Sequence, residues 1–246
     1  MRYDVLVDIG QVRQNNEDVA WAGVNKNENF AGIVCDGLGG YKGGSTASSI
    51  VVDVFKERFS DINLNFFSRE EIFDWIQKTI SVARDRISNK IKENHQLKNM
   101  ATTFVACIVV NSKAYIFNIG DSRAWYISKN KAEQITQDQN LYNYLIKNKA
   151  EKEIFELYRD NLYAITQFVG AQTEKKLSID VYEFDIQEGV YIVLTSDGTH
   201  NFISVNEIKR CLIDSNMKFN DVCTAVIAKA MANGSNDNLS IVIMEF

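Results

Sequence analysis

Carboxylate side chains recur in four short polar motifs of this sequence, and their spacing suggests chemistry. The motifs are NNED at residues 15–18, CDGLGG at 35–40, TSDG at 195–198 and GSNDN at 234–238. Each places an acid beside an apolar, strand-like run or inside a turn rich in glycine and asparagine. Oxygen-only ligands suit hard divalent cations such as Mg²⁺ and Mn²⁺. The pattern therefore predicts a metal site and indicates metal-assisted hydrolysis.

Each motif taken alone has a simpler explanation. An Asp-Gly pair such as the one at Asp36 or Asp197 is a common turn former, and Asp18 could merely begin a strand. The four together are more informative, because strand ends aim side chains at one rim of a sheet. Carboxylates gathered at such a rim repel one another strongly, and a bound cation would offset that repulsion.

The elements that must position these acids come in blocks of strands and blocks of helices. Residues 3–9 alternate and are rich in Val and Ile, which predicts a strand. Strand-like runs also predict strands at residues 18–24, 30–36, 102–110, 113–119, 122–128, 131–135, 177–184, 190–195 and 239–246. Helical periodicity begins near residues 45, 68 and 204 and covers 221–232, and residues 140–161 are helix-prone. Capping-box spacing marks two of the helix starts, at Ser68 with Glu71 and at Ser204 with Glu207.

Strands joined by short turns indicate antiparallel pairing, and the blocks lack the regular alternation of a parallel α/β sheet. The sequence shows neither a repeat nor a low-complexity linker. We therefore expect one α+β domain over residues 1–246, built from antiparallel sheets covered by helices.

Composition narrows the class of protein. The chain has 246 residues, 46% of them hydrophobic, and a net charge of −5 at pH 7 without a basic run, which argues against nucleic acid as a partner. No apolar run is long enough to span a bilayer, and no signal peptide is recognisable, so we expect a cytoplasmic protein without a membrane partner. The four cysteines form no C-x-x-C pair and no Cys-x5-Arg loop, which favours buried thiols over a cysteine phosphatase.

Eight motifs in order carry a family resemblance. They are DIGQVRQNNED, VCDGLGGYKGG, MATTF, NIGDSRAWYI, ITQDQN, AITQFVG, VLTSDG and GSNDNLSIVI, and they span nearly the whole chain. In their order and spacing they resemble the metal-dependent serine/threonine protein phosphatases of the protein phosphatase 2C family, most closely its compact bacterial members. The resemblance implies a four-layer αββα sandwich, in which two antiparallel sheets face each other between outer helices.

The resemblance also implies a site for two Mn²⁺ or Mg²⁺ ions. In the family's pattern, Asp36 bridges both ions and the Gly37 carbonyl binds the first. Glu17 and Asp18 support the first ion directly or through water, and the second ion is held by Asp197 and Asp237.

Arg13, five residues before Asp18, would contact the substrate phosphate, because a guanidinium fork fits two phosphate oxygens. The implied reaction is direct attack on phosphorus by a hydroxide that bridges the two metals, with no covalent intermediate. Asp121 could bind a further metal or its waters. For Arg123, a salt bridge that holds the hairpin turn is preferred to a substrate role. His95 is expected at the surface.

The chain departs from the family's pattern at four positions. Leu38 replaces a histidine or methionine and cannot protonate a leaving group. Asn201 replaces an aspartate, which leaves open whether a third metal binds at Asp121 and Asp197. Ala101 replaces a glycine, and Gln167 replaces a basic residue. Residues 140–161 correspond to the family's variable flap beside the site, which we expect to select substrates.

The leading hypothesis is a Mn²⁺- or Mg²⁺-dependent phosphatase acting, as a monomer, on phosphoserine and phosphothreonine in the targets of a bacterial serine/threonine kinase, and on the kinase itself. Two alternatives share the fold: a catalytically silent relative that binds phosphoproteins, and a phosphatase for small phosphomonoesters or anti-sigma-type regulators. A silent relative would be expected to have lost a metal-binding carboxylate, and all the matched acids are present.

Overall fold

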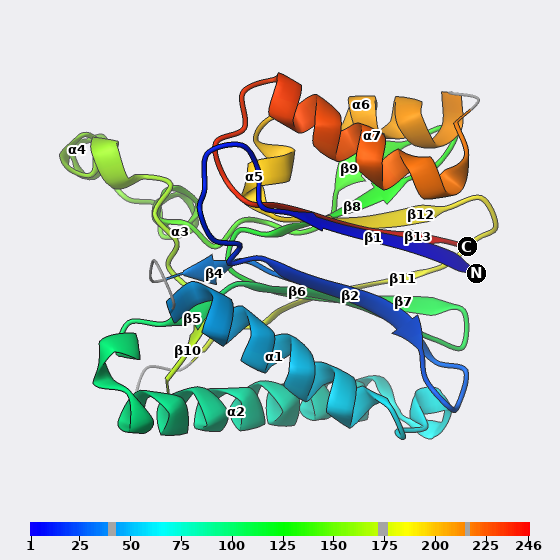
Figure 1. The fold of residues 1–246 in the computed structure, drawn as a ribbon, viewed down its shortest axis with the longest axis horizontal. Coiled ribbons are helices and arrows are strands. Elements are labelled where there is room, and N and C mark those ends of the chain that lie inside the picture. The colour runs from blue at the N-terminus through cyan, green and yellow to red at the C-terminus, as the bar shows by residue number, and fades with distance from the viewer. Residues whose placement is uncertain (39–42, 172–176, 215–216) are drawn as a thin grey trace.

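The computed structural model describes residues 1–38, 43–171, 177–214 and 217–246. Two five-stranded sheets lie face to face, and helices cover the outer face of each (Figure 1). The chain is thus an αββα sandwich, as the sequence predicts.

Each large sheet is antiparallel throughout. The first runs in the order β1 (Arg2–Asp8), β13 (Leu239–Glu245), β12 (Tyr191–Thr195), β8 (Arg123–Ile127) and β9 (Ala132–Gln134). The second runs β11 (Asp180–Asp185), β7 (Lys113–Ile119), β6 (Phe104–Val110), β3 (Phe30–Cys35) and β2 (Val19–Val24). In the first sheet β1 pairs with β13, and in the second β3 pairs with β6, so strands far apart in the sequence are direct neighbours.

Helices α1 (Gly43–Phe59) and α2 (Arg69–Glu93) cover the second sheet, and α5 (Asp197–His200), α6 (Val205–Lys209) and α7 (Phe219–Ala232) cover the first (Figure 1). Both predicted capping boxes are present. The Ser68 hydroxyl accepts from the Glu71 amide at 3.2 Å, and Ser204 and Glu207 repeat the arrangement at 3.3 Å. Such caps satisfy amides that have no partner within the helix.

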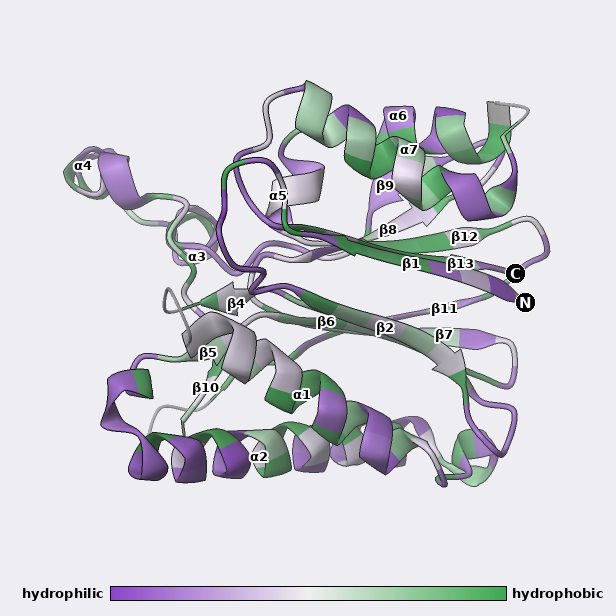
Figure 2. Cartoon of the chain, viewed as in Figure 1, coloured by the Kyte–Doolittle hydropathy of each residue, from purple (hydrophilic) through white to green (hydrophobic). Residues whose placement is uncertain are grey.

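The period of two residues in a strand divides the core into three layers. On β13, Val242 and Met244 face the opposite sheet, whereas Ile241 and Ile243 pack under α6 and α7. A third layer of buried side chains lies between α1, α2 and the second sheet, and it includes Phe55. Figure 2 shows apolar residues along the strands and hydrophilic ones along much of α2. Burial on both faces of each sheet fixes the strand register that the site requires.

Two parts of the fold add detail that the sequence-based expectation lacks. A small third sheet joins β4 (Gly37–Leu38), β5 (Ala101–Thr102) and β10 (Val169–Gly170). Thr102 was expected at the start of the strand at residues 102–110, but this separate sheet was not expected. Residues 140–161, expected to be helix-prone, form two short helices, α3 (Leu141–Lys147) and α4 (Lys152–Leu157), followed by a 3₁₀ turn at Arg159–Asn161. The helical conformation is interrupted between α3 and α4, where Lys149 has a φ of 53°. This segment projects from the sandwich (Figure 1).

The remaining described elements are short. They are 3₁₀ turns at Leu64–Phe66 and His95–Leu97 and a π-helical turn at Arg210–Asp214. His95 is exposed, as expected. None of the four cysteines forms a disulfide; Cys211 is half-buried and the others are buried. Within the described residues, no helix is both long enough and apolar enough to cross a membrane.

Candidate active site

The predicted acids meet at one end of the sandwich because of the strand pairing. Val19 pairs with Cys35, so Asp18 before β2 and Asp36 after β3 lie at the same rim of the second sheet. Thr195 pairs with Ile241, so Asp197 after β12 and Asp237 before β13 share the corresponding rim of the first sheet. The two rims meet where α5, β4 and the loop that precedes β2 come together (Figure 1). We call Glu17, Asp18, Asp36, Asp121, Asp197 and Asp237 the acidic centre.

The electrostatics of the acidic centre show how closely these groups interact. Burial raises the pKa of Asp36 well above its usual value, and the neighbouring charges of Asp18, Asp197, Asp121 and Asp237 raise it further. Burial likewise raises the pKa of Asp18 to about 7, although hydrogen bonds from serine hydroxyls oppose that shift. Desolvation and like charge both disfavour the anion, which is the situation that a bound cation relieves.

Asp197, Asp121 and Glu17 experience the same field. Burial raises the pKa of Asp197, with a further rise from Asp237, while a hydrogen bond with Asp36 lowers it. Burial and the charge of Asp197 raise the pKa of Asp121 to about 7. The pKa of Glu17 is also raised, mainly by burial. Acids from five separate segments of the chain therefore share one electrostatic environment.

Threonine and serine hydroxyls fix the backbone around Asp36. The Asp36 amide donates to Thr103 Oγ1 at 2.9 Å, and the Asp36 carbonyl accepts from Thr102 Oγ1 at 2.9 Å. Thr103 Oγ1 in turn lies 2.7 Å from Ser122 Oγ, next to Asp121. The MATTF motif thus positions the strand end that carries Asp36, and Ala101 of this motif pairs with Leu38 in the small sheet.

Ser196 connects both sheets at Asp18. Its hydroxyl donates to Asp18 Oδ2 at 2.6 Å and accepts from the Ser240 amide at 3.0 Å. Ser196 is fully buried and directly precedes Asp197. One hydroxyl thereby links the segments that carry Asp18, Asp197 and Asp237.

Asn238 ties the loop before β2 to the start of β13. Its side-chain oxygen accepts from the Glu17 amide at 2.9 Å. Its amide nitrogen donates to the carbonyls of Ile9 and Asn15, at 2.8 and 3.0 Å. These three bonds hold Glu17 and Asp18 against the strand that begins after Asp237.

Close backbone approach explains two of the glycines. A Cβ on Gly37 would lie 2.6 Å from the Glu17 carbonyl oxygen and 2.4 Å from the Gly44 carbonyl carbon. A Cβ on Gly198 would lie only 2.0 Å from the Asn238 carbonyl oxygen. Both contacts bring acid-bearing segments together more closely than any side chain would allow. Of the glycine-rich loop, residues 39–42 lie outside the described part of the chain.

Arg13 lies at the mouth of the acidic centre. Its Nη2 donates to Asp237 Oδ2 at 2.6 Å, and 54% of its side chain is exposed. Glu17 and Asp197 also attract the guanidinium, which raises the pKa of Arg13. The sequence did not anticipate this pairing between the predicted phosphate contact and a predicted metal ligand.

The donor chemistry of the acidic centre suits hard cations, because every side-chain donor in it is a carboxylate oxygen. Within the described ranges, no three His, Cys, Asp or Glu residues are already set closely enough to hold an ion. The case for metal binding therefore rests on oxygen donors that share a buried, mutually repulsive field, and not on a preformed ligand set.

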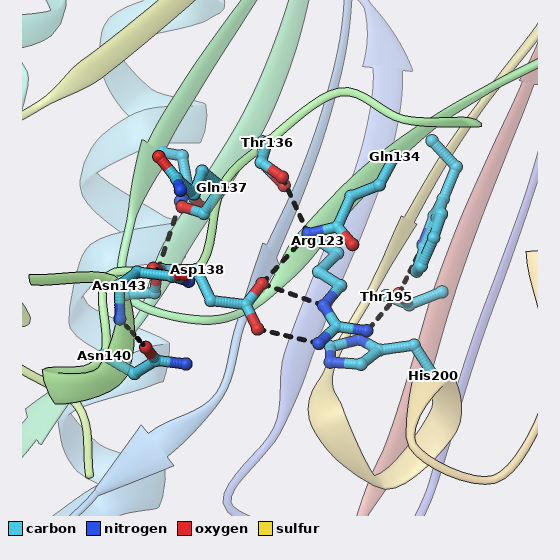
Figure 3. Close-up of polar contacts among 12 residues, drawn as sticks. Arg123, Gln134, Thr136, Gln137, Asp138, Asn140, Asn143, Thr195 and His200 are labelled. Carbon is cyan, nitrogen blue, oxygen red and sulfur yellow. Dashed lines mark hydrogen bonds and ion pairs between the residues drawn. The ribbon is translucent and has the colours of Figure 1, made fainter. Parts of the chain in front are cut away.

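Arg123 and His200 stabilise the surroundings of the centre (Figure 3). Arg123 donates to both carboxylate oxygens of Asp138, at 2.8 and 2.7 Å, which agrees with the predicted structural salt bridge. His200 is 7% exposed, and its Nδ1 lies 3.0 Å from Thr195 Oγ1, which also accepts from Trp125 Nε1. Burial lowers the pKa of His200 well below 6.5, so the ring is neutral and structural.

Comparison with known proteins gives a consistent result. The family model described as Protein phosphatase 2C matches residues 10–240. A putative protein phosphatase of Mycoplasma genitalium is 33% identical over 239 residues, covering 96% of this chain and 91% of that protein. A serine/threonine phosphatase, stp, of Listeria monocytogenes is 28% identical and covers 100% of this chain and 96% of its own.

A solved structure agrees with these sequence relatives. The serine/threonine phosphatase of S. agalactiae superposes with a TM-score of 0.87 at 27% identity, covering 98% of both chains. Fold and acidic rim together place the molecule among the protein phosphatases. The chain belongs to the protein phosphatase 2C family, in its bacterial form, and is a serine/threonine protein phosphatase by descent.

Several residues that shape the site were not singled out from the sequence. Ser196, Asn238 and Asp138 each lie beside a residue that was, or within a quoted motif, but their roles depend on partners far away in the chain. The motifs TSDG, GSNDN and ITQDQN therefore carried a signal at these positions, although no spacing rule identified it.

Proposed function

We propose that this phosphatase hydrolyses phosphoserine and phosphothreonine in proteins with the help of two Mn²⁺ or Mg²⁺ ions bound at the acidic centre. The observation that carries the proposal is the convergence of buried carboxylates from separate segments, each raising the pKa of another. Cations are the simplest means of holding such a group ionised at neutral pH.

The residues fall into two sets. Glu17, Asp18 and the Gly37 carbonyl would serve the first ion, Asp197 and Asp237 would serve the second, and Asp36 would bridge both. When bound, the pair would lower the pKa of a water towards ~7 and so supply the nucleophile that attacks phosphorus. In support, a structure of the PstP catalytic domain is described with two manganese ions; its TM-score of 0.79 at 22% identity shows the same fold.

Arg13 has the geometry to receive the phosphate. Among the described residues, its guanidinium donates a hydrogen bond from Nη2 to Asp237, and 54% of the side chain is exposed. A guanidinium has five donors in a planar fork, so it can keep the Asp237 contact while it donates to two phosphate oxygens. Asp237 would thus orient Arg13 as well as contribute to the second ion.

At Leu38 and Asn201 the chain departs from the family's pattern, and this restricts which groups can take part in the reaction. Leu38 has no proton to donate, so departure of the serine or threonine oxygen must be assisted by another group. Asn201 caps α5 through its backbone, donating to the Asp197 carbonyl at 3.0 Å, and its side chain is exposed. Asp121 therefore stands as a candidate for a third ion without a second acid at that position.

The proposal extends to biological context. The substrates would be proteins phosphorylated by a bacterial serine/threonine kinase, including the kinase itself, with the enzyme acting as a monomer in the cytoplasm. Residues 140–161 would act as the flap that meets the protein part of the substrate. A comparison of phosphopeptides with phosphorylated metabolites would show whether small phosphomonoesters are preferred instead.

The proposal is tested by removing single carboxylates. Asp36→Asn, Asp197→Asn and Asp237→Asn should each abolish Mn²⁺-dependent hydrolysis of p-nitrophenyl phosphate while the protein remains folded. Asp74→Asn, at an exposed acid on α2, is the matched control and should retain full activity. Full turnover in all three variants, or activity that EDTA does not affect, would refute the assigned roles. No turnover by the wild type would favour a silent relative.

A further inference from the structure

Backbone hydrogen bonds join the two ends of the flap to each other. The Leu141 amide donates to the Ala164 carbonyl at 2.9 Å, and the Tyr142 amide donates to the Leu162 carbonyl at 2.6 Å. The Gln139 carbonyl accepts from the Thr166 amide at 2.8 Å. The two stems of the flap, residues 139–142 and 162–166, therefore move as one unit.

Two consecutive residues attach this unit to the hairpin that carries Asp121. Gln139 exchanges two hydrogen bonds with Gly120: its amide donates to the Gly120 carbonyl at 2.9 Å, and its Oε1 accepts from the Gly120 amide at 2.8 Å. The Asp138 carboxylate accepts hydrogen bonds from Nε and Nη2 of Arg123 (Figure 3). The Asp138 backbone carbonyl accepts a hydrogen bond from the Asn143 side chain on α3 at 2.8 Å.

The ion pair between Arg123 and Asp138 is well placed to act as a rigid joint. Its side chains are 22% and 12% exposed, which makes it the least exposed ion pair among the described residues. Gln134 Nε2 adds a third donor to Asp138 at 3.0 Å, and the Arg123 guanidinium lies 5.7 Å from the centre of the Trp125 ring. Bidentate, partly desolvated pairs are stronger and more directional than surface pairs.

The joint leads directly into the acidic centre. Arg123 follows Asp121 by two residues, and it pairs across the sheet with Thr195, two residues before Asp197. The flap on one side and two members of the acidic centre on the other are thus attached to one side-chain pair.

We propose that Asp138 is a positioning residue, whose ion pair with Arg123 fixes the flap base relative to the acidic centre and thereby sets the affinity for phosphoprotein substrates. The inference rests on the proposed function of the acidic centre. A small phosphate ester reaches only the acidic centre and Arg13, whereas a phosphopeptide also meets the flap. Loss of the joint should therefore affect the two kinds of substrate differently.

The test compares Asp138→Asn with wild type on a phosphothreonine peptide and on p-nitrophenyl phosphate, with Mn²⁺ in both assays. We expect KM for the peptide to rise about tenfold, equivalent to about 1.4 kcal/mol, while both constants for the small ester stay within about twofold. Hydrogen exchange should accelerate at the flap amides of residues 141–166. If Asp138→Asn does not fold, Arg123→Lys, which keeps the charge but loses the fork, is assessed by the same criteria.

The matched control is Glu57→Gln, which breaks another bidentate pair, with Arg86, at 3.0 and 2.6 Å on the outer surface of α1 and α2. It should alter neither substrate's kinetics nor flap exchange. Equal loss on both substrates, unchanged peptide KM, or unchanged flap exchange would each overturn the proposal. If wild type turns over neither substrate, the proposed function fails, and hydrogen exchange alone still decides whether Asp138 fixes the flap.

Discussion

The hydroxyl of Ser196 allows a quantitative test of how the acidic centre is held together. Ser196→Ala removes a donor to Asp18 Oδ2 at 2.6 Å and leaves the buried Ser240 amide without its acceptor at 3.0 Å. A hydrogen bond to a charged group contributes roughly 1.5–3 kcal/mol, and an unsatisfied buried amide costs roughly 1–3 kcal/mol. We therefore expect a loss of about 3 kcal/mol in the free energy of unfolding, which corresponds to a fall in Tm of roughly 6–12 °C for a chain of this size.

The loss should depend on pH with a defined sign. The pKa of Asp18 is about 7, and the Ser196 hydrogen bond lowers it, so this bond stabilises the anion. The cost of Ser196→Ala should therefore be larger at a pH of about 8.5, where Asp18 is ionised, than at about 6, where it is protonated. Urea unfolding in the presence of EDTA at both pH values measures the difference without a contribution from bound metal.

A neighbouring serine provides the control. Ser235 is also buried, and its hydroxyl makes one neutral bond, to the Gly198 carbonyl at 2.7 Å. Ser235→Ala should cost only about 1 kcal/mol and show no comparable pH dependence. The reasoning is refuted if the two variants lose equal stability, or if the cost of Ser196→Ala is the same at both pH values.

Three further predictions concern stability. Because burial holds the pKa of His200 well below 6.5, the free energy of unfolding should fall as pH drops below about 6.5. On acidification to about pH 5.5, His200→Gln should lose about 1.4 kcal/mol less of it than wild type, and an equal loss would contradict the assignment. Gly198→Ala, whose Cβ would lie 2.0 Å from the Asn238 carbonyl oxygen, should lower the free energy of unfolding by about 2 kcal/mol or more. Urea unfolding measures the loss, and an unchanged midpoint contradicts the assigned contact. Mn²⁺ at about 100 times its Kd should raise wild-type stability by about 2.7 kcal/mol in thermal unfolding, and an equal rise in Asp36→Asn would disprove the assigned bridge.

Much of the fold could be predicted because its signals are local. The apolar run of β3, the capping residues at Ser68 and the helical periodicity of α2 each involve neighbouring residues, and the structure confirms all three elements. The small sheet of β4, β5 and β10 could not be predicted, because two-residue strands have no periodicity and form only through contacts between distant segments. Residues 140–161 are helical as expected, but helix propensity alone does not mark where α3 ends and α4 begins.

The sequence predicted which residues form the acidic centre but not the contacts that they make. Asp36 and Asp197 follow apolar strands, and strand pairing brings their rims together. The contact between Arg13 and Asp237 has no sequence signal, because it joins residues 224 positions apart. Ser196 was missed for a similar reason: a serine in a turn gives no indication of which distant carboxylate it will reach.

The position of β13 has a consequence for synthesis. It lies between β1 and β12, so the earliest and latest strands of the sequence are direct neighbours within one sheet (Figure 1). A nascent chain on the ribosome that has not yet extruded residues 239–245 exposes two unpaired strand edges, which are liable to associate with other polypeptides. The half of the molecule made by α1, α2 and their sheet also awaits β11, so neither half can be completed early. We therefore expect the nascent chain to remain prone to association with other polypeptides until residues 239–245 have left the ribosome.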